Sequence, residues 1–265
     1  MEDGFAGAPM SSALPPETLD EIARLVSCKD FLALSATSTE LRGRYWGVGS
    51  QAELDAALLA QDTHVIVLTV PGLTVSTAPV SGAHVYAMAD AHVAAGTVHV
   101  RDDGVHLIAT GYAEVHAAGH AHVTAHDYAR VHAHTEAHVT AHDCARVSAY
   151  ARTQVDAYGG ALVTAREHAQ VAAHDQAQVT AADWSRVRAY GRAHVAMESR
   201  DCWIAASEGT AVYGTDGHLL YTSTVSLALY NPNRSFLTAP HRIDAEWSEL
   251  EGLWNAQHSG SCEIL

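Results

Sequence analysis

Histidine is the residue type with the clearest capacity for chemistry in this sequence, because the chain contains 19 of them. His126, His142 and His174 are each followed by aspartate and recur at multiples of a 16-residue period. Imidazole and carboxylate groups at such spacing could bind Zn, Cu or Ni. Tyr158 and Tyr190 replace histidine in the same series, however, and tyrosine is poorly suited to those metals. The exchange favours a ladder of stacked planar rings, so we predict no metal site and no cofactor.

No spacing of residues indicates a catalytic centre. The sequence contains no G-x-S-x-G, no H-E-x-x-H and no P-loop. Its four cysteines lie far apart and follow neither a metal-binding nor a disulfide pattern, which suits a reducing compartment. We therefore expect a cytoplasmic protein that is not an enzyme and has no catalytic residues.

An eight-residue repeat must position these side chains. Alanine lies two residues before and two residues after nearly every valine of the repeat, so these apolar side chains share one face of a strand. A period of eight does not keep one face of an α-helix in line, which excludes a helix. The valines of the predicted solenoid core recur without a miss at Val115, Val123, Val131, Val139, Val147, Val155, Val163, Val171, Val179, Val187 and Val195.

The turn residues indicate two such strands per coil. The fourth residue after each strand's central residue is Gly or Asp in alternate octads, from Gly111 to Gly191. The intervening series is mixed and includes Thr135, Ala151 and Glu167. Gly and Asp tolerate the left-handed backbone of tight turns. We therefore predict a mainly β fold, a single-chain β-solenoid (β-helix) whose two-faced coils each take about 16 residues.

The outward positions of the strands are polar and mixed. With a 16-residue coil, His122 and His138 form one row, and Arg130 and Arg146 form another. We expect these rows to supply the recognition face for a protein partner. The variety of the outward residues excludes the regular threonine rows of ice-binding solenoids.

Charge and hydropathy argue against nucleic-acid and membrane partners. The formal net charge is −15, but residues 113–197 hold eight acidic residues and seven arginines. The repeat is therefore nearly neutral, which is unlike a DNA mimic or a nucleic-acid binder. No stretch of 18 apolar residues exists, so we expect no stable membrane insertion.

The N-terminal segment has a different pattern. Residues 14–46 begin with Leu-Pro, continue through an apolar stripe of helical spacing and end at Trp46. This segment resembles an F-box, a small three-helix module that docks substrate adaptors onto cullin–RING ubiquitin ligases. The resemblance implies a ligase adaptor subunit as one partner, an unknown protein target as another, and a host-cell cytosol if the protein is a microbial effector. It also implies that the adaptor subunit contacts Leu14, Pro15, Leu19, Ile22 and Leu25.

A structural role is the alternative. Valine octads also resemble the triple-stranded β-helices of phage tail spikes and secretion-system tips, although those use V-x-G where this chain has alanine. That alternative implies a spike-like protein without ligase docking. Cys262 is a weak candidate for lipidation. It is the fourth residue from the end of the sequence, as is the cysteine of a prenylation box, but no polybasic stretch accompanies it.

The sequence thus divides into five parts. A short amphipathic helix is predicted at 51–61, and a closing helix, marked by three apolar residues at helical spacing, at 244–257. The parts are a flexible tail at 1–13, the F-box-like module at 14–48, a linker or capping helix at 49–63, the solenoid at 64–200 with regular octads at 113–197, and C-terminal strands with a capping helix at 201–265.

Overall fold

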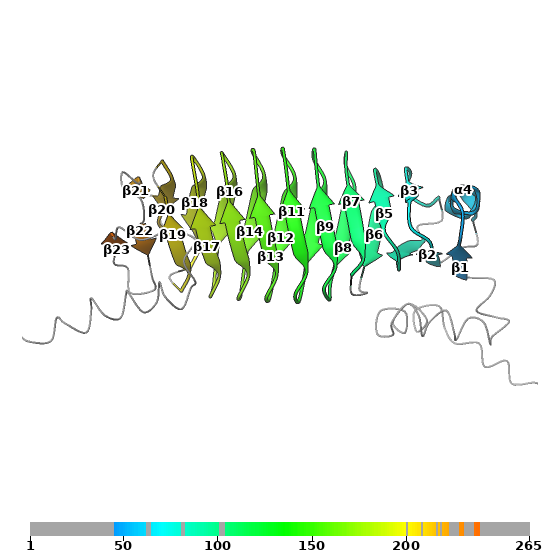
Figure 1. Cartoon of the computed structure of the whole chain (residues 1–265), viewed down its shortest axis with the longest axis horizontal. Coiled ribbons are helices and arrows are strands. Elements are labelled where there is room, and N and C mark those ends of the chain that lie inside the picture. The colour runs from blue at the N-terminus through cyan, green and yellow to red at the C-terminus, as the bar shows by residue number, and fades with distance from the viewer. Residues whose placement is uncertain are drawn as a thin grey trace, which may run out of the picture.

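The computed structural model describes the side chains of most residues between 46 and 217, and the backbone of four further segments. The side chains are described at 46–61, 65–80, 83–100, 104–199, 201–207, 209–215 and 217, and the backbone alone at residue 45, 219–222, 228–230 and 236–238. Residues 14–44 of the F-box-like segment, the predicted closing helix and Cys262 lie outside this range. Within it the chain forms an elongated β-solenoid (Figure 1).

Two sheets form the walls of the solenoid, and from β2 to β20 the chain alternates between them. Sheet A contains β1 (Tyr45–Val48), β2 (Val65–Leu68), β4 (His84–Ala87), β6 (Thr97–Val100), β8 (Glu114–Ala117), β10 (Arg130–Ala133), β12 (Arg146–Ala149), β14 (Leu162–Ala165), β16 (Gln178–Ala181), β18 (His194–Met197), β20 (Ala211–Tyr213) and β21 (Leu219–Thr222). Sheet B contains β3 (Leu73–Val75), β5 (Ala91–Val93), β7 (His106–Ala109), β9 (His122–Ala125), β11 (His138–Ala141), β13 (Gln154–Ala157), β15 (Gln170–Ala173), β17 (Arg186–Ala189), β19 (Trp203–Ala206), β22 (Ala228–Tyr230) and β23 (Phe236–Thr238).

The register of the parallel strands confirms the predicted coil. Val131 in β10 pairs with Val115 in β8 and with Val147 in β12, so neighbouring strands of sheet A follow the 16-residue period. Val139 in β11 pairs in the same way with Val123 and Val155 in sheet B. Each coil of the regular region therefore contributes one strand to each sheet.

Along the regular octads the core consists almost entirely of valine and alanine. All eleven octad valines are buried, none more than 3% exposed, and the flanking alanines are buried with them. Thr153 and Ser185 replace alanine at two of these inward positions. Thr153 donates its hydroxyl to the carbonyl of Tyr150 at 2.6 Å, so its polar group is satisfied within the corner. Such small side chains leave room only for a narrow interior.

Both corners of each coil use left-handed backbone, although the sequence pointed to only one of the two series. Asp127 and Asp143 have φ values of 57° and 58°, but Thr135, Ala151 and Glu167 of the mixed series also have φ between 56° and 62°. Most of these corners are closed by a backbone hydrogen bond between residues three apart, such as that from Ala129 N–H to His126 O. The chain must make the same tight turn at both corners of a coil. This requirement overrides the preference of Thr, Ala and Glu for right-handed or extended backbone.

The polar corner residues also connect successive coils. The Asp127 carboxylate accepts a hydrogen bond from the backbone N–H of Gly111 at 3.1 Å, one coil earlier. The Thr135 hydroxyl accepts from Gly119 N–H at 2.7 Å, and the Glu167 carboxylate from Ala151 N–H at 3.0 Å. These bonds satisfy backbone donors that the corner would otherwise leave to solvent.

The N-terminal end of the solenoid is closed by a strand and a helix. Helix α4 (Gln51–Leu59) confirms the predicted capping helix and buries Leu54 and Leu58. Its first turn is capped by the Ser50 hydroxyl, which accepts from Glu53 N–H. Residues 45–48, predicted as the end of the helical module, instead form β1, because they extend the edge of sheet A by pairing with β2. Any helical module must therefore end before Tyr45.

The coils next to each end are less regular than those in the middle. Val65 pairs with His84, so this coil is longer than the regular one, whereas Val85 pairs with Val98 and closes a shorter coil. This agrees with the looser repeat of residues 64–112. At the other end β21, β22 and β23 pair in the antiparallel direction, which ends the parallel stack. Over the part of the chain that the structure describes, no helix has the length and apolar character needed to cross a membrane.

Candidate protein-binding groove

The predicted recognition residues form two rows on different sheets. His122 and His138 are register partners in sheet B, and their rings stack with centroids 5.0 Å apart. Arg130 and Arg146 are register partners in sheet A. The rows exist as expected, but the core lies between the two sheets. The four side chains therefore do not form a single face.

The histidine series considered for metal binding forms a ladder of stacked rings at one corner. Successive members are 4.7–5.2 Å apart with interplanar angles of 2–14°, as the His/Tyr exchange predicted. The ladder consists of His126, His142, Tyr158, His174 and Tyr190.

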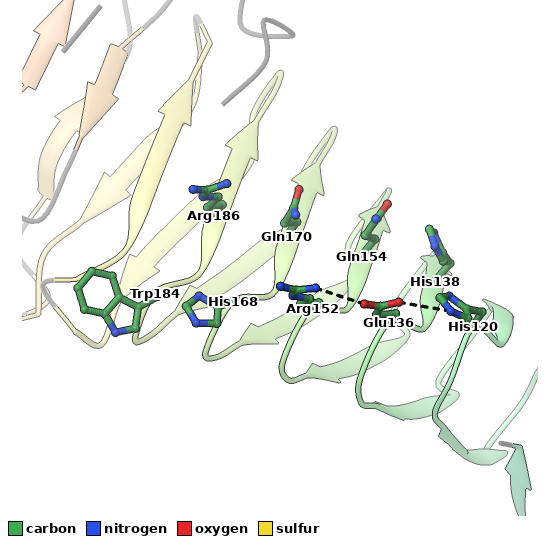
Figure 2. A pocket seen from close by; sticks show the side chains of 9 residues that line it. All are labelled: His120, Glu136, His138, Arg152, Gln154, His168, Gln170, Trp184 and Arg186. Carbon is green, nitrogen blue, oxygen red and sulfur yellow. Dashed lines mark ion pairs between the residues drawn. The ribbon is translucent and has the colours of Figure 1, made fainter. Parts of the chain in front are cut away.

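The opposite corner borders a groove that runs along the solenoid. One wall is a row of corner side chains, one from each coil, and the other is a row from the adjoining strands of sheet B (Figure 2). The hollow between the rows has a volume of about 570 Å³. The corner row is His120, Glu136, Arg152, His168 and Trp184, and the strand row is His138, Gln154, Gln170 and Arg186.

The strand periodicity explains why the two rows lie side by side. Arg152 and Gln154 are two residues apart, with the inward Thr153 between them, so both project from the outer surface. Trp184 and Arg186 have the same relation around Ser185. Stacking of the coils then repeats each pair along the solenoid axis at about 4.8 Å intervals.

A second hollow lies on the other side of the corner row. It has a volume of about 540 Å³ and is floored by the left-handed corner residues Gly119, Thr135, Ala151 and Glu167. Two of these four residues have side chains no larger than a methyl group. The corner row is therefore a ridge between two hollows, accessible from both sides.

The groove carries exposed groups of both charges. Glu136 forms ion pairs with His120 at 3.3 Å and with Arg152 at 3.5 Å. These pairs are solvent-exposed, so each contributes at most about 1 kcal/mol to stability. The lining contains two arginines and one glutamate, so it carries a small net positive charge when the histidines are neutral.

An exposed tryptophan ends the corner row. Trp184 is 55% exposed and belongs to the corner between strands β16 and β17. Tryptophan and arginine are enriched in protein interfaces, where they contribute a large share of the binding energy. Together these features suit the binding of a polypeptide segment.

The pKa values of His122 and Cys202, among others, are shifted from their usual range. Burial, followed by the neighbouring histidines His106, His138 and His120, lowers the pKa of His122. Burial raises the pKa of the Cys202 thiol to about 12, so this cysteine stays protonated in the core.

The groove was missed from sequence because its two walls come from alternate octads, one from the position just before the first inward residue of the octad and the other from the position just after it. The signal that could have found it is the run of large polar or aromatic residues at the first of these positions, ending at Trp184. Comparison of the chain with family models, curated proteins and solved structures finds no match.

Proposed function

We propose that this protein is a non-enzymatic interaction scaffold whose groove binds an extended segment of a partner protein. The observation that carries the proposal is the groove itself, which combines exposed Trp184 with Arg152 and Arg186 in two continuous rows. The corner row spans five coils, and the four spacings of about 4.8 Å between them give a length of about 19 Å. An extended chain rises about 3.3 Å per residue, so about six residues would fill the groove.

Charge complementarity favours an acidic segment. The lining has two arginines and one glutamate, and Glu136 is already paired with His120 and Arg152. Gln154 and Gln170 lie between His138 and Arg186 in the strand row and can hydrogen-bond to the backbone of an extended peptide. An apolar side chain of the partner would pack on the exposed ring of Trp184.

We further propose that the F-box-like segment at 14–46 docks the bound partner to a cullin–RING ubiquitin ligase. The support is the resemblance of Leu14, Pro15, Leu19, Ile22 and Leu25 to the docking residues of that family. The chain's single lysine, Lys29, is a second support, because an adaptor with almost no lysine is a poor substrate for its own ligase. The protein would then act in a eukaryotic cytosol, as an endogenous adaptor or as a microbial effector.

Peptide selection tests the groove. Peptides selected from a random library against the full-length protein should be enriched in Asp and Glu around an apolar residue. Trp184→Ala should weaken the selected peptides about tenfold or more, and Arg152→Glu should also weaken them. Tyr128→Ala is the matched control, because Tyr128 is an equally exposed aromatic (56%) on the opposite corner. Equal binding by Trp184→Ala and wild type would refute the groove as the recognition surface.

A pull-down tests the ligase role separately. The full-length protein should retain a purified ligase adaptor subunit, and the double variant Leu14→Asp, Leu19→Asp should not. No binding by the wild type at micromolar concentration would refute the ligase role and leave the groove proposal standing. A trimer in light scattering would instead favour the spike-like alternative, since an adaptor of this kind is expected to be a monomer.

A further inference from the structure

A second cluster of chemical groups lies on sheet A, away from the groove. Glu114 and His116 are two residues apart on β8, so both side chains project from the outer face. His132 on β10 is the register partner of His116 and is brought beside it by the 16-residue coil. The three side chains thus meet although the sequence separates them.

The two distances between the carboxylate and the imidazoles of this cluster match those of a metal site. The Nε2 atoms of His116 and His132 each lie 3.4 Å from the same carboxylate oxygen, Oε1 of Glu114. For ligands about 2.05 Å from a Zn²⁺ ion, the edge of a tetrahedron is about 3.4 Å. All three ligand atoms lie within 4.8 Å of one another. Over the described residues, this is the one group of three such side chains that comes so close.

We propose that Glu114, His116 and His132 form a binding site for a divalent transition-metal ion, with Zn²⁺ as the best fit. Two imidazoles and one carboxylate are ligands that Zn²⁺ commonly takes. Three protein ligands leave the fourth position of a tetrahedron open to water or to a group of another molecule.

The surroundings of the cluster hold the histidine rings in place and leave the site accessible. His99 stacks on the other side of His116, with ring centroids 4.9 Å apart, and His132 stacks on the near side at 4.9 Å. The side chains of all three ligands are 35–38% exposed, so an ion can enter from solvent without opening the fold.

The corner ladder provides the contrast. His126 and His142 also stack, at 4.8 Å, but the nearest carboxylate contact there is a longer one of 3.6 Å, between His126 Nδ1 and Asp143. Each of these histidines therefore lacks a shared carboxylate oxygen at tetrahedral spacing. The cluster on sheet A differs from the ladder by Glu114, whose oxygen lies between two imidazoles.

Calorimetry with the full-length, tag-free protein after chelator treatment tests the site, with Zn²⁺ as the probe. The wild type should bind one ion per chain more tightly than any others. Glu114→Gln and His132→Gln should each weaken this binding about tenfold or more. The double variant His126→Gln, His142→Gln is the matched control and should leave it unchanged. Loss of binding in this control, or unchanged binding in both site variants, would overturn the proposal.

Two further readouts separate ligation from folding. Far-UV circular dichroism should be the same for Glu114→Gln and wild type, because the substitution preserves the size of an exposed side chain. Bound Co²⁺ should show the intense visible absorption of a tetrahedral ion in the wild type only. A weak, octahedral-type spectrum in the wild type would show surface binding of a hydrated ion and would overturn the tetrahedral site.

Discussion

Replacing Ala151 by glycine should stabilise the solenoid. Ala151 lies in the corner series that the sequence did not identify as left-handed, with a φ of 56°. The left-handed conformation costs a residue with a Cβ about 1–2 kcal/mol, and glycine avoids that strain. Glycine also loses more backbone freedom on folding, which offsets about 0.5–1 kcal/mol. The net gain is therefore about 0.5–1 kcal/mol.

The same substitution elsewhere in a corner gives the control. Ala118 precedes left-handed Gly119 but is not itself left-handed, so Ala118→Gly should destabilise the protein by about 0.5–1 kcal/mol. Thermal unfolding followed by circular dichroism measures both variants. One kcal/mol corresponds to a shift of about 2–4 °C in Tm for a protein of this size. Opposite shifts are expected, and a fall in Tm for both variants would refute the argument from backbone strain.

Ala151→Asp provides a second variant at the same position. Asp127 accepts a hydrogen bond from Gly111 N–H of the preceding coil, and an aspartate at 151 would be placed to accept from Thr135 N–H in the same way. Aspartate also tolerates the left-handed region better than alanine does. The variant should therefore be more stable than the wild type by about 1 kcal/mol.

Three further predictions concern a core valine, a corner glycine and the dependence of stability on pH. Val147→Asp should cost more than about 4 kcal/mol and unfold the regular coils in circular dichroism, because it buries an unpaired charge; an unchanged Tm would contradict the inward position of Val147. Gly159→Ala should lower Tm, because the added Cβ at φ +63° would lie 3.3 Å from Asp143 N, and an unaltered Tm would argue against that close approach. The folded-state pKa of His122 is lowered, so the unfolded chain binds more protons in acid. The stability that His122 contributes above about pH 6.5 is then lost as the pH falls. The urea midpoint of unfolding should therefore fall less for His122→Gln than for wild type between about pH 7.5 and 5.5. Equal pH dependence of the two midpoints would count against the lowered pKa.

The core and the coil were predictable because they depend on local periodicity. Alternation along a strand places Val139 and its flanking alanines on one face whatever the surrounding structure is. The 16-residue period of the corner residues then fixes which strands pair. Register partners such as Val131 and Val147 follow directly from that period.

The conformation of the mixed corners was not predictable from their residues. Thr135, Ala151 and Glu167 have no common preference for left-handed backbone, and the β-branched Thr135 disfavours it. Their conformation follows from the stacking of one corner on the next, which is a property of the assembled solenoid. Hydrogen bonds such as that from Gly119 N–H to Thr135 Oγ1 become available only after stacking.

Both candidate sites depend on adjacency between coils. From sequence, the His-Asp pairs of the corner were considered for metal binding, and the replacement of histidine by tyrosine in that series predicted a stack of rings instead. Glu114, His116 and His132 were overlooked because their relation combines a two-residue step along a strand with a 16-residue step across the sheet. The groove beside Trp184 likewise combines a two-residue step along the chain with a 16-residue step between coils.

The uniform register has a consequence for how the gene can change. In the regular region each coil contacts its neighbours through the same pairs of positions, so unequal crossing over between repeats can add or delete one 16-residue unit without disturbing the strands on either side. Such events would lengthen or shorten the groove in equal steps. The N-terminal coils, whose register partners depart from this period in both directions, do not permit the exchange. Descendants of this gene should therefore vary in length between residues 113 and 197 by whole coils while keeping their end structures.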